Sequence, residues 1–276
     1  MVKKQLIMER ALELFAQQGI DATSVQQITD HCGISKGAFY LAYKSKDELI
    51  LAMIDHFMMQ FTSDLDYVVK NTNNDQLLYE FYYTIYSTFQ KHSDFAKILI
   101  KEQSQSLNND LFLKIQYYDS LMGKSILLML ERLYGEEITP IKFDLFFCIR
   151  GFMNTYSHLF LFFNLPLDLE ILSKSLVEKT NLLARHSTIP FISEEVIQLV
   201  KHPKSEEVSK EQLVEMVVQK IDEIEEPIEK ESLILLKEQL VNQTYSPAII
   251  KGLLENIKDH PQCKWISYLL RNYFDF

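Results

Sequence analysis

The chain has 276 residues, 47% of them hydrophobic, which is enough to form one or two domains with a sizeable core. Only seven glycines and seven prolines interrupt it, a composition that favours long packed helices over turn-rich β structure. The formal net charge of -10 argues against a protein that binds nucleic acids over its whole surface, because such affinity comes mainly from cations that neutralise phosphates.

Signals for export, membrane insertion and metal binding are weak. The N-terminal segment carries Glu9, Arg10 and Glu13 where a signal peptide would be apolar. The most apolar window, residues 143–163, contains Asp144, Arg150, Asn154 and His158 and therefore favours a buried helix over a membrane span. The three cysteines share no metal-ligand or redox spacing, so we expect a cytoplasmic protein with no metal, no cofactor and no membrane contact.

The first helical pattern covers residues 3–18, where apolar side chains recur on one face and Gly19 follows. Thr23 or Ser24 can cap a second, short helix, because Ser24-Val-Gln-Gln27 has the form of a capping box. This helix is expected to end near Gly33.

After the turn at Gly33, Ser35 can cap a third helix that runs to about Ala42. Ser45-Lys-Asp-Glu48 has the form of a second capping box and opens a long fourth helix. Four helices are therefore expected before residue 70.

Further helical patterns follow a polar stretch at residues 71–75. Thr139 is expected to cap an apolar helix with Pro140 at its first position, and Pro166 and Pro190 are expected to break the chain. The patterns cover residues 76–91, 94–104, 108–134, 141–163 and 168–185.

Beyond Pro190, prolines divide the chain into short helices, with evident caps at Ser209 and Ser246-Pro247. An acidic run between Glu223 and Glu231 is most simply a solvated helix face, with a contact surface as the alternative. We therefore expect an all-α fold with three parts: a three-helix helix-turn-helix domain at 1–47, joined by a long helix to a body at 48–189, and a helical extension at 190–276.

The second and third helices and their turn have the form of a helix-turn-helix, whose second helix can enter the major groove of DNA. The stretch from His31 to Lys46 has no acidic residue and three lysines. The overall negative charge is thus compatible with a local basic patch.

These residues resemble the N-terminal domain of the TetR family of transcriptional regulators. The resemblance covers about residues 3–55 and rests on Thr23-Ser-Val-Gln-Gln-Ile28, Cys32-Gly-Ile-Ser-Lys-Gly37, Phe39-Tyr40, Tyr43 and Lys44-Ser-Lys-Asp-Glu-Leu49. It implies a DNA-binding regulator, most simply a repressor, and no catalysis.

The resemblance implies phosphate contacts from Thr23, Tyr40 and Lys46, and it places Lys36, Gly37 and Ala38 nearest the bases. Lys46 would also lie at a helix N-terminus, where the backbone favours a phosphate. The full set of expected DNA-binding residues is Thr23, Ser24, Ser35, Lys36, Gly37, Ala38, Phe39, Tyr40, Lys44 and Lys46.

Two positions depart from the family's usual pattern. Tyr43 stands where phenylalanine is commoner, and we expect its ring to fill the core with its hydroxyl turned outward. Ala42 stands where a larger residue often reaches the DNA backbone, so the details of the contacts are expected to differ.

Aromatic residues are dense between residues 79 and 163, and most must pack in a core while some could line a cavity. The resemblance implies a ligand among the middle helices, lined by Tyr82, Tyr86, Phe89, Tyr117, Met122, Phe152 and Tyr156. Such a lining would suit an apolar or aromatic effector.

The resemblance also implies a homodimer that pairs the helices near 141–163 and 168–186 and binds a double-stranded, roughly palindromic operator. Effector binding would move the fourth helix and release the DNA. The role of the extension stays open between bracing the dimer, covering the ligand site and binding another protein.

Two other interpretations compete with this one. Gly123-Lys124-Ser125 is similar to the end of a phosphate-binding loop, but no strand precedes it and the first required glycine is a tyrosine, so an enzyme is disfavoured. The alternative retained is a helix-turn-helix regulator whose body binds a protein rather than a small molecule.

Overall fold

The computed structural model describes residues 2–93, 95–96, 109–162, 167–200 and 208–276, and every regular element within these ranges is helical. The expected all-α fold is confirmed. None of the helices in these ranges is both long and apolar enough to cross a membrane.

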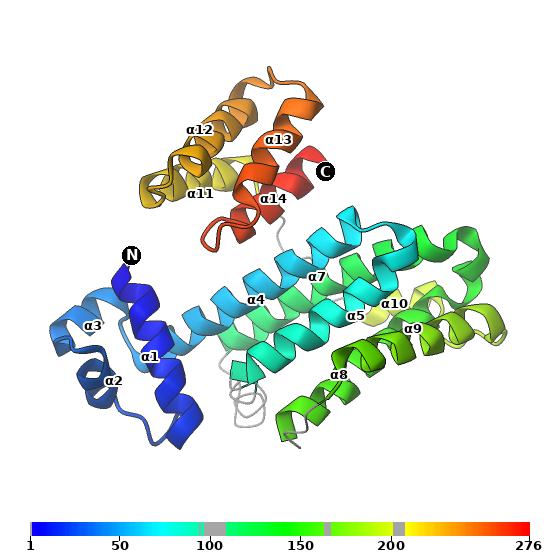
Figure 1. The fold of residues 1–276 in the computed structure, drawn as a ribbon, viewed down its shortest axis with the longest axis horizontal. Helices are drawn as coiled ribbons and strands as arrows, with labels where there is room; N and C mark the ends of the chain where they lie inside the picture. Colours follow the sequence, from blue (N-terminus) through cyan, green and yellow to red (C-terminus); the bar gives the residue numbers. More distant parts are fainter. Residues whose placement is uncertain (1, 94, 97–108, 163–166, 201–207) are drawn as a thin grey trace.

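Three short helices form a small bundle at one end of the molecule (Figure 1). They are α1 (Val2–Gln18), α2 (Val25–Cys32) and α3 (Lys36–Ala42). Their apolar faces meet in a core that includes Ile7, Phe15 and Ile28, none of which is more than 2% exposed. The predicted helix-turn-helix is therefore present, and its packed centre belongs to the hydrophobic core that continues along α4.

The helix α4 (Lys46–Asn71) leads from this bundle into the body. It packs against α5 (Asn74–Lys91) and α7 (Asn109–Tyr134). The body continues through the 3-10 helix η1 (Gly135–Ile141) to α8 (Lys142–Phe162) and α9 (Leu169–His186), which both pack on α5. As one continuous helix, α4 links the first three helices mechanically to the body.

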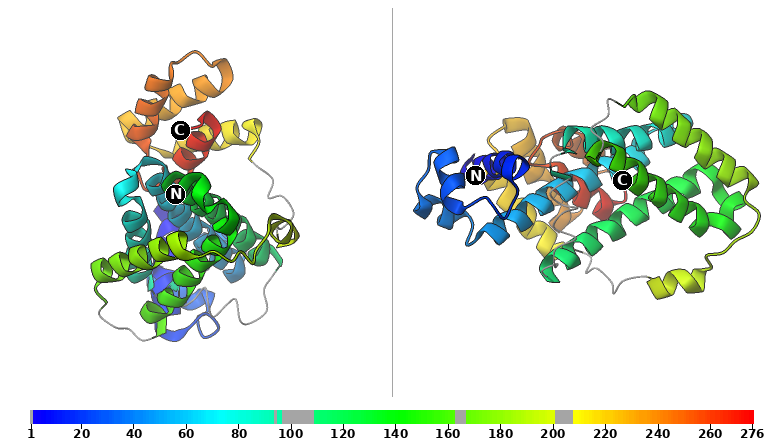
Figure 2. Two further views of the ribbon diagram at one scale, coloured as in Figure 1. Left: turned by 90° about the vertical axis from the view of Figure 1, so that its right-hand side faces the viewer. Right: turned by 90° about the horizontal axis from the view of Figure 1, so that it is seen from below.

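After α10 (Glu194–Val200), four helices form a separate layer: α11 (Lys210–Glu223), α12 (Pro227–Asn242), α13 (Pro247–Ile257) and α14 (Lys264–Phe274). We call α11–α14 the extension. It packs on α4 through α14 and lies on the side of the body opposite α8 and α9 (Figures 1 and 2). The structure thus separates the extension from the helices expected to pair two subunits.

Capping patterns in the sequence predicted most helix ends correctly. The capping box of Ser24 and Gln27 is present, as are caps by Ser35 and Ser209 and a proline at the first position of α13. The second expected capping box is only half formed. Ser45 Oγ accepts a hydrogen bond from the backbone N–H of Glu48 (3.0 Å), whereas the Glu48 carboxylate accepts from Lys44 rather than from Ser45.

The expected cap at Thr139 was wrong. Thr139 and Pro140 lie inside η1, and α8 begins only at Lys142. The buried side chains of Ile138 and Ile141 hold this 3-10 turn against the body core, so tertiary packing overrides the local pattern. Most of the pattern expected at 94–104, together with Phe163, Pro166 and Pro203, lies outside the described residues.

Candidate nucleic-acid interface

The turn between α2 and α3 depends on Gly33. Its φ of 66° lies in the left-handed region, where a residue without Cβ is least strained. The N–H of the next residue, Ile34, donates to the Thr29 carbonyl at 3.0 Å and closes the end of α2. This geometry sets the direction in which α3 leaves α2.

The inner face of α3 is fixed by aromatic packing. Phe39 has no exposed surface and contacts the rings of Tyr40 and Tyr43. A direct DNA contact from Phe39 was among our expectations, and its burial excludes that role in this structure. Its contribution is to hold α3 on the bundle.

Tyr43 fills the core as expected, but the expectation of an outward hydroxyl was wrong. The hydroxyl donates to the backbone carbonyl of Lys4 at 3.2 Å, which ties the end of α3 to α1. Burial raises the pKa of Tyr43 to about 12, so the hydroxyl keeps its proton for this bond.

The outer face of α3 presents four exposed residues, Lys36, Gly37, Tyr40 and Leu41. Tyr40 is 52% exposed and Leu41 is 90% exposed. They fall at helical spacings of one and four, so they form one strip along the helix. Sequence reasoning missed Leu41, although its position four residues after Gly37 would have indicated the same face.

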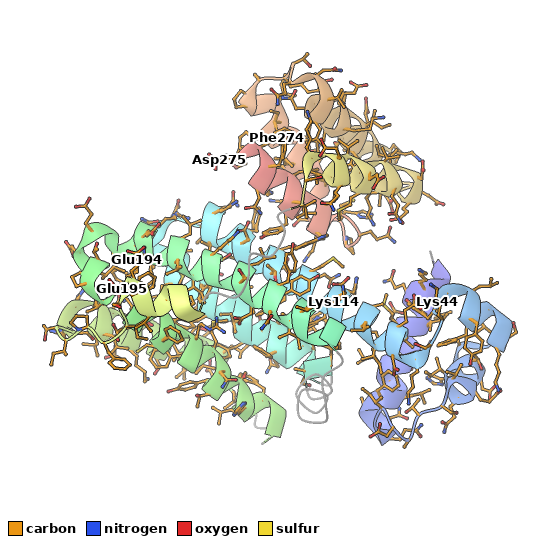
Figure 3. All side chains as sticks on the ribbon, turned by 180° about the vertical axis from the view of Figure 1, so that it is seen from behind. Lys44, Lys114, Glu194, Glu195, Phe274 and Asp275 are labelled. Carbon is orange, nitrogen blue, oxygen red and sulfur yellow. The ribbon has the colours of Figure 1, made fainter. Side chains whose placement is uncertain are left out.

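The ends of the neighbouring helices surround this strip. Ser24 and Ser35 are exposed, and each uses its hydroxyl to cap a backbone N–H of its own helix. Ala38 is half-buried beside Ser35, and Lys44 is exposed in the turn before α4 (Figure 3). Helix N-termini of this kind offer free N–H groups and a positive dipole end to an anion.

Thr23 departs from the expected role of a phosphate contact. Its side chain is fully buried, and its hydroxyl donates to the Gly19 carbonyl at 2.6 Å and accepts from Gln18 Nε2 at 3.1 Å. Both hydrogen bonds are internal, so in this structure Thr23 shapes the loop between α1 and α2 instead of facing a ligand.

Lys46 is half-buried, and it too is engaged inside the domain. Its ammonium donates to the carbonyl oxygens of Ile20 (2.9 Å) and Thr23 (3.2 Å). Two of its three N–H donors thereby join the start of α4 to the loop before α2. A phosphate contact, which stays a prediction, would have to use the third.

The carboxylate of Glu13 on α1 is paired within the bundle. Glu13 accepts hydrogen bonds from Arg10 (2.8 Å) and pairs with His31 (2.7 Å). The contact with His31, followed by that with Arg10, lowers the pKa of Glu13. The stretch from His31 to Lys46 itself contributes no carboxylate that would compete with DNA for its lysines.

The seven residues expected to line a ligand site do not line one cavity together, and only Phe152 and Tyr156 border the same hollow. Tyr82 and Tyr86 are fully buried in the body core. The Tyr82 hydroxyl shares a hydrogen bond with Thr180 (2.7 Å), and the Tyr86 hydroxyl donates to the Phe152 carbonyl (2.9 Å). Burial raises the pKa values of both tyrosines, so both act as neutral core residues.

Three further members of that set lie elsewhere. Phe89 packs edge-on against Phe61 of α4, and Met122 packs against the core of the body and that of the extension. Tyr117 contacts Trp265 of the extension, with ring centroids 6.5 Å apart. Covering the ligand site was one of the roles left open for the extension, and the extension does cover α7 at Tyr117.

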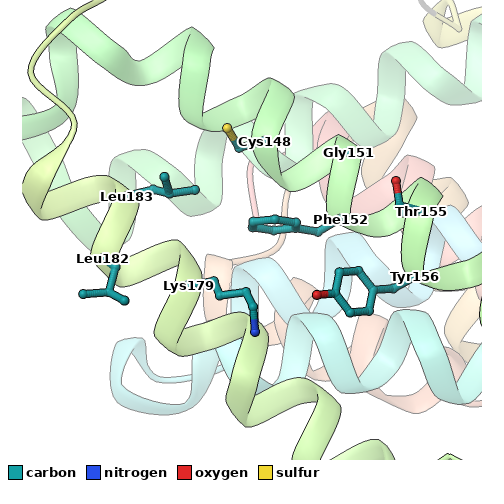
Figure 4. Close-up of a pocket in the computed structure, with 8 residues that line it drawn as sticks. All are labelled: Cys148, Gly151, Phe152, Thr155, Tyr156, Lys179, Leu182 and Leu183. Carbon is teal, nitrogen blue, oxygen red and sulfur yellow. The ribbon is translucent and has the colours of Figure 1, made fainter.

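Phe152 and Tyr156 do share a hollow. It has a volume of about 680 Å³ and lies between α8 and α9 (Figure 4). Most of its lining is apolar, and Lys179 supplies the cation. The lining residues are Cys148, Gly151, Phe152, Thr155, Tyr156, Lys179, Leu182 and Leu183.

The same face of α8 and α9 carries exposed apolar side chains. Phe147 is 39% exposed, Leu182 51% and Ile171 66%. Gly151 lies among them, and a Cβ there would meet no atom within 4 Å. This face is therefore open and largely apolar, as a surface that receives another protein would be.

In the described ranges, no group of three or more His, Cys, Asp or Glu side chains is arranged to hold a metal ion. The exposed strip on α3, its flanking helix ends and the local lysines are thus the features with the clearest chemistry. They suit a duplex with phosphates on the outside and base edges in a groove.

Comparisons with known proteins agree with this geometry. Residues 7–53 match the family model for bacterial regulatory proteins of the tetR family. The chain is 29% identical over 269 residues to YerO of Bacillus subtilis (strain 168), an uncharacterized HTH-type transcriptional regulator, with 92% of this chain and 89% of that protein covered. It is 28% identical to YuxN, another uncharacterized HTH-type regulator from the same organism, over 96% of this chain and 97% of that protein.

A solved structure extends the comparison to the fold. The crystal structure of a transcriptional regulator (TerR/AcrR family) from Aquifex aeolicus VF5 superposes with a TM-score of 0.51 and is 26% identical. The match covers 99% of that chain but only 66% of this one. Part of the present molecule therefore has no counterpart in that regulator.

Proposed function

The chain belongs to the TetR family of bacterial regulatory proteins, and we propose that this DNA-binding transcriptional regulator is a homodimeric repressor that an apolar or aromatic effector releases from a roughly palindromic operator. Different residues support the DNA contact, the dimer and the effector.

One observation carries the DNA contact: the exposed strip of Lys36, Gly37, Tyr40 and Leu41 on α3. Gly37 lets the helix approach the base edges closely, and Lys36 and Tyr40 offer donors to phosphates or bases. The methyl groups of Leu41 suit the methyl group of thymine. We propose phosphate contacts from Lys44, the third N–H of Lys46 and the helix ends capped by Ser24 and Ser35.

The open face of α8 and α9 supports the dimer. Pairing this face with its copy about a two-fold axis would bury Phe147, Ile171 and Leu182, which are exposed in a single chain. Two copies of α3 would then meet two half-sites, so the operator would be a palindrome with half-sites about one helical turn apart, roughly 34–36 Å.

The hollow at Phe152 and Tyr156 supports the effector. Its apolar lining suits an apolar or aromatic molecule, and Lys179 and the Tyr156 hydroxyl offer donors to orient polar atoms. The hollow lies on the proposed dimer face, so occupation would change how two subunits meet. A coupling of about 1–3 kcal/mol is enough to change operator occupancy severalfold or more.

The test is selection of bound duplexes from a random DNA pool by the purified full-length protein, with the selected sequences retested at two salt concentrations. We expect an enriched palindrome whose affinity falls as salt rises. Failure to enrich any sequence would contradict the proposal, and enrichment of single half-sites would contradict its dimeric part.

The selected operator also serves to test the effector. Apolar and aromatic compounds that release it from the protein would support the ligand-released mechanism. If none releases it, the body is more consistent with a regulator that responds to a protein partner.

A further inference from the structure

The extension covers the connecting helix α4. Helix α14 packs along α4, and α4 packs on α7 as well, so α4 is held between the body and the extension (Figure 1). One hydrophobic core includes Met53 and Met58 of α4, Leu121 of α7 and Leu270 of α14. The extension is thus packed against the helix that carries the DNA-binding end.

Charged side chains fix this contact at several points of α4. Lys264 of α14 forms an ion pair with Asp64, with its Nζ 2.7 Å from Oδ1. Lys70, near the end of α4, donates to Asn272 Oδ1 at 3.0 Å. Contacts of this directional kind define one register of α14 along α4.

Tyr67 of α4 is the anchor of the contact. Lys258 lies 4.8 Å and Arg271 5.0 Å from the centre of its ring, and Lys258 Nζ donates to its hydroxyl at 2.7 Å. Arg271 is only 3% exposed and pairs with Glu255 at 2.7 Å. One half-buried ring on α4 thus holds two cations of the extension, one that directly follows α13 and one in α14.

The extension also reaches α7 through its single tryptophan. Trp265 contacts Tyr117 and Tyr118 with ring centroids 6.5 and 5.9 Å away, and it stacks on Tyr268 at 4.9 Å. The Tyr118 hydroxyl in turn donates to Asp55 of α4 at 2.7 Å. Since the chain has no other tryptophan, Trp265 fluorescence reports whether the extension is docked.

The length of α4 makes its orientation important. A helix of 26 residues is about 39 Å long, so a tilt of about 5° moves its far end by about 3 Å. This displacement is close to the rise of one base pair, about 3.4 Å. The match between two copies of α3 and two half-sites therefore depends on how firmly α4 is held.

We propose that the extension is a built-in brace on α4, with Tyr67 as the positioning residue, and that it sets the spacing between operator half-sites that the dimer accepts. This inference rests on the proposed operator binding and adds a role for the part of the chain beyond α10. With the brace released, α4 samples more orientations, so binding at the best spacing weakens and discrimination between spacings falls.

The experiment compares the full-length protein with two ways of releasing the brace. Tyr67→Ala removes the ring that holds both cations. Asp64→Lys places a positive charge against Lys264, and adding Lys264→Asp restores an ion pair of opposite polarity. Tyr83→Ala, an exposed aromatic residue on α5, is the matched control for loss of a tyrosine on a body helix.

Two measurements are made on each variant: Trp265 emission, and affinity for operators with the selected half-site spacing or with one base pair more or less. We expect Tyr67→Ala and Asp64→Lys to shift the emission of Trp265. We also expect them to lower, about fivefold or more, the ratio of the affinity for the selected spacing to the affinity for an altered spacing. The added Lys264→Asp change should recover both properties, and Tyr83→Ala should alter neither.

The proposal that the extension braces α4 would be overturned by variants that shift Trp265 emission but keep the wild-type affinity and the wild-type ratio of affinities between spacings. Wild-type emission in both Tyr67→Ala and Asp64→Lys would overturn it as well, because the anchor would then be misassigned. Recovery by the reversed ion pair distinguishes loss of docking from misfolding. If the wild-type protein selects no operator, the proposed function fails instead, a result that the selection reveals before any variant is made.

Discussion

At the scale of single residues, the exposed strip of α3 combines two kinds of chemistry. Lys36 offers a charge, which attracts phosphates and can donate to guanine. Leu41 offers only methyl groups, and because it is 90% exposed, covering it with an apolar partner would be favourable. The strip thus has separate residues for electrostatic attraction and for apolar contact.

Replacing these two residues should have different effects. Lys36→Ala is expected to weaken operator binding, to reduce its dependence on salt and to change the preferred bases. Leu41→Ala should change the preferred bases, at a cost of about 1–3 kcal/mol at the affected position, without changing the salt dependence. Binding isotherms over a salt series check both, and equal salt slopes in the two variants would contradict this division.

At the scale of elements, α4 is the helix that packs against both the body and the extension. His56 is half-buried on α4 and accepts a hydrogen bond from Gln60 Nε2 at 3.2 Å in its neutral form. Burial lowers its pKa below 6.5, Asp55 opposes the shift, and Lys220 of α11 adds to it. The neutral imidazole is therefore the form that fits between α4 and the extension.

This shift predicts how stability depends on pH. A histidine whose folded pKa is lowered contributes stability that is complete above its unfolded value, near 6.5, and is lost as pH falls through the folded value. Acidification below 6.5 should thus lower the melting temperature of the wild type more than that of His56→Gln. Thermal unfolding over a pH series checks this, with His186→Gln at the exposed end of α9 as the control. Parallel pH profiles for wild type and His56→Gln would show that His56 is not responsible.

At the scale of the whole molecule, the elements leave three surfaces with separate tasks. The strip of α3 lies at one end, the extension covers one side of α4, and the open face of α8 and α9 lies on the opposite side (Figures 1 and 2). The proposed dimer face and the extension therefore lie on different sides of the body. The arrangement allows the dimer and the brace to exist together.

A glycine offers a clean test of the dimer. Gly151→Glu places a charged side chain into open space on α8, so the subunit should fold while the paired face is blocked. Gly252 on α13 is the matched control, because a Cβ there also meets nothing within 4 Å and lies on the extension. Light scattering after size-exclusion chromatography should give monomers for Gly151→Glu and dimers for wild type and Gly252→Glu. A dimeric Gly151→Glu would place the interface elsewhere.

Much of the fold was determined by signals within a few residues. Ser24, Ser35 and Ser209 cap their helices as the sequence predicted, and Gly33 makes the expected turn, because these hydrogen bonds join residues three to five positions apart. Apolar periodicity identified the faces of α1 and α4 for the same reason: a helix presents its own spacing to any core. The resemblance to TetR regulators followed from this local pattern, and the comparisons confirmed it.

Only the tertiary structure decided where contacts between distant segments fall. In the folded chain Thr23 and Phe39 are buried and Leu41 is exposed. The Lys46 ammonium donates to carbonyl oxygens of the loop before α2. The tertiary structure also buries Tyr82 and Tyr86 in the body core, and it places the extension on α4 through partners about 200 residues apart such as Asp64 and Lys264. Periodicity tells which face of a helix is buried but not against what, because the partner is chosen by packing over the whole chain.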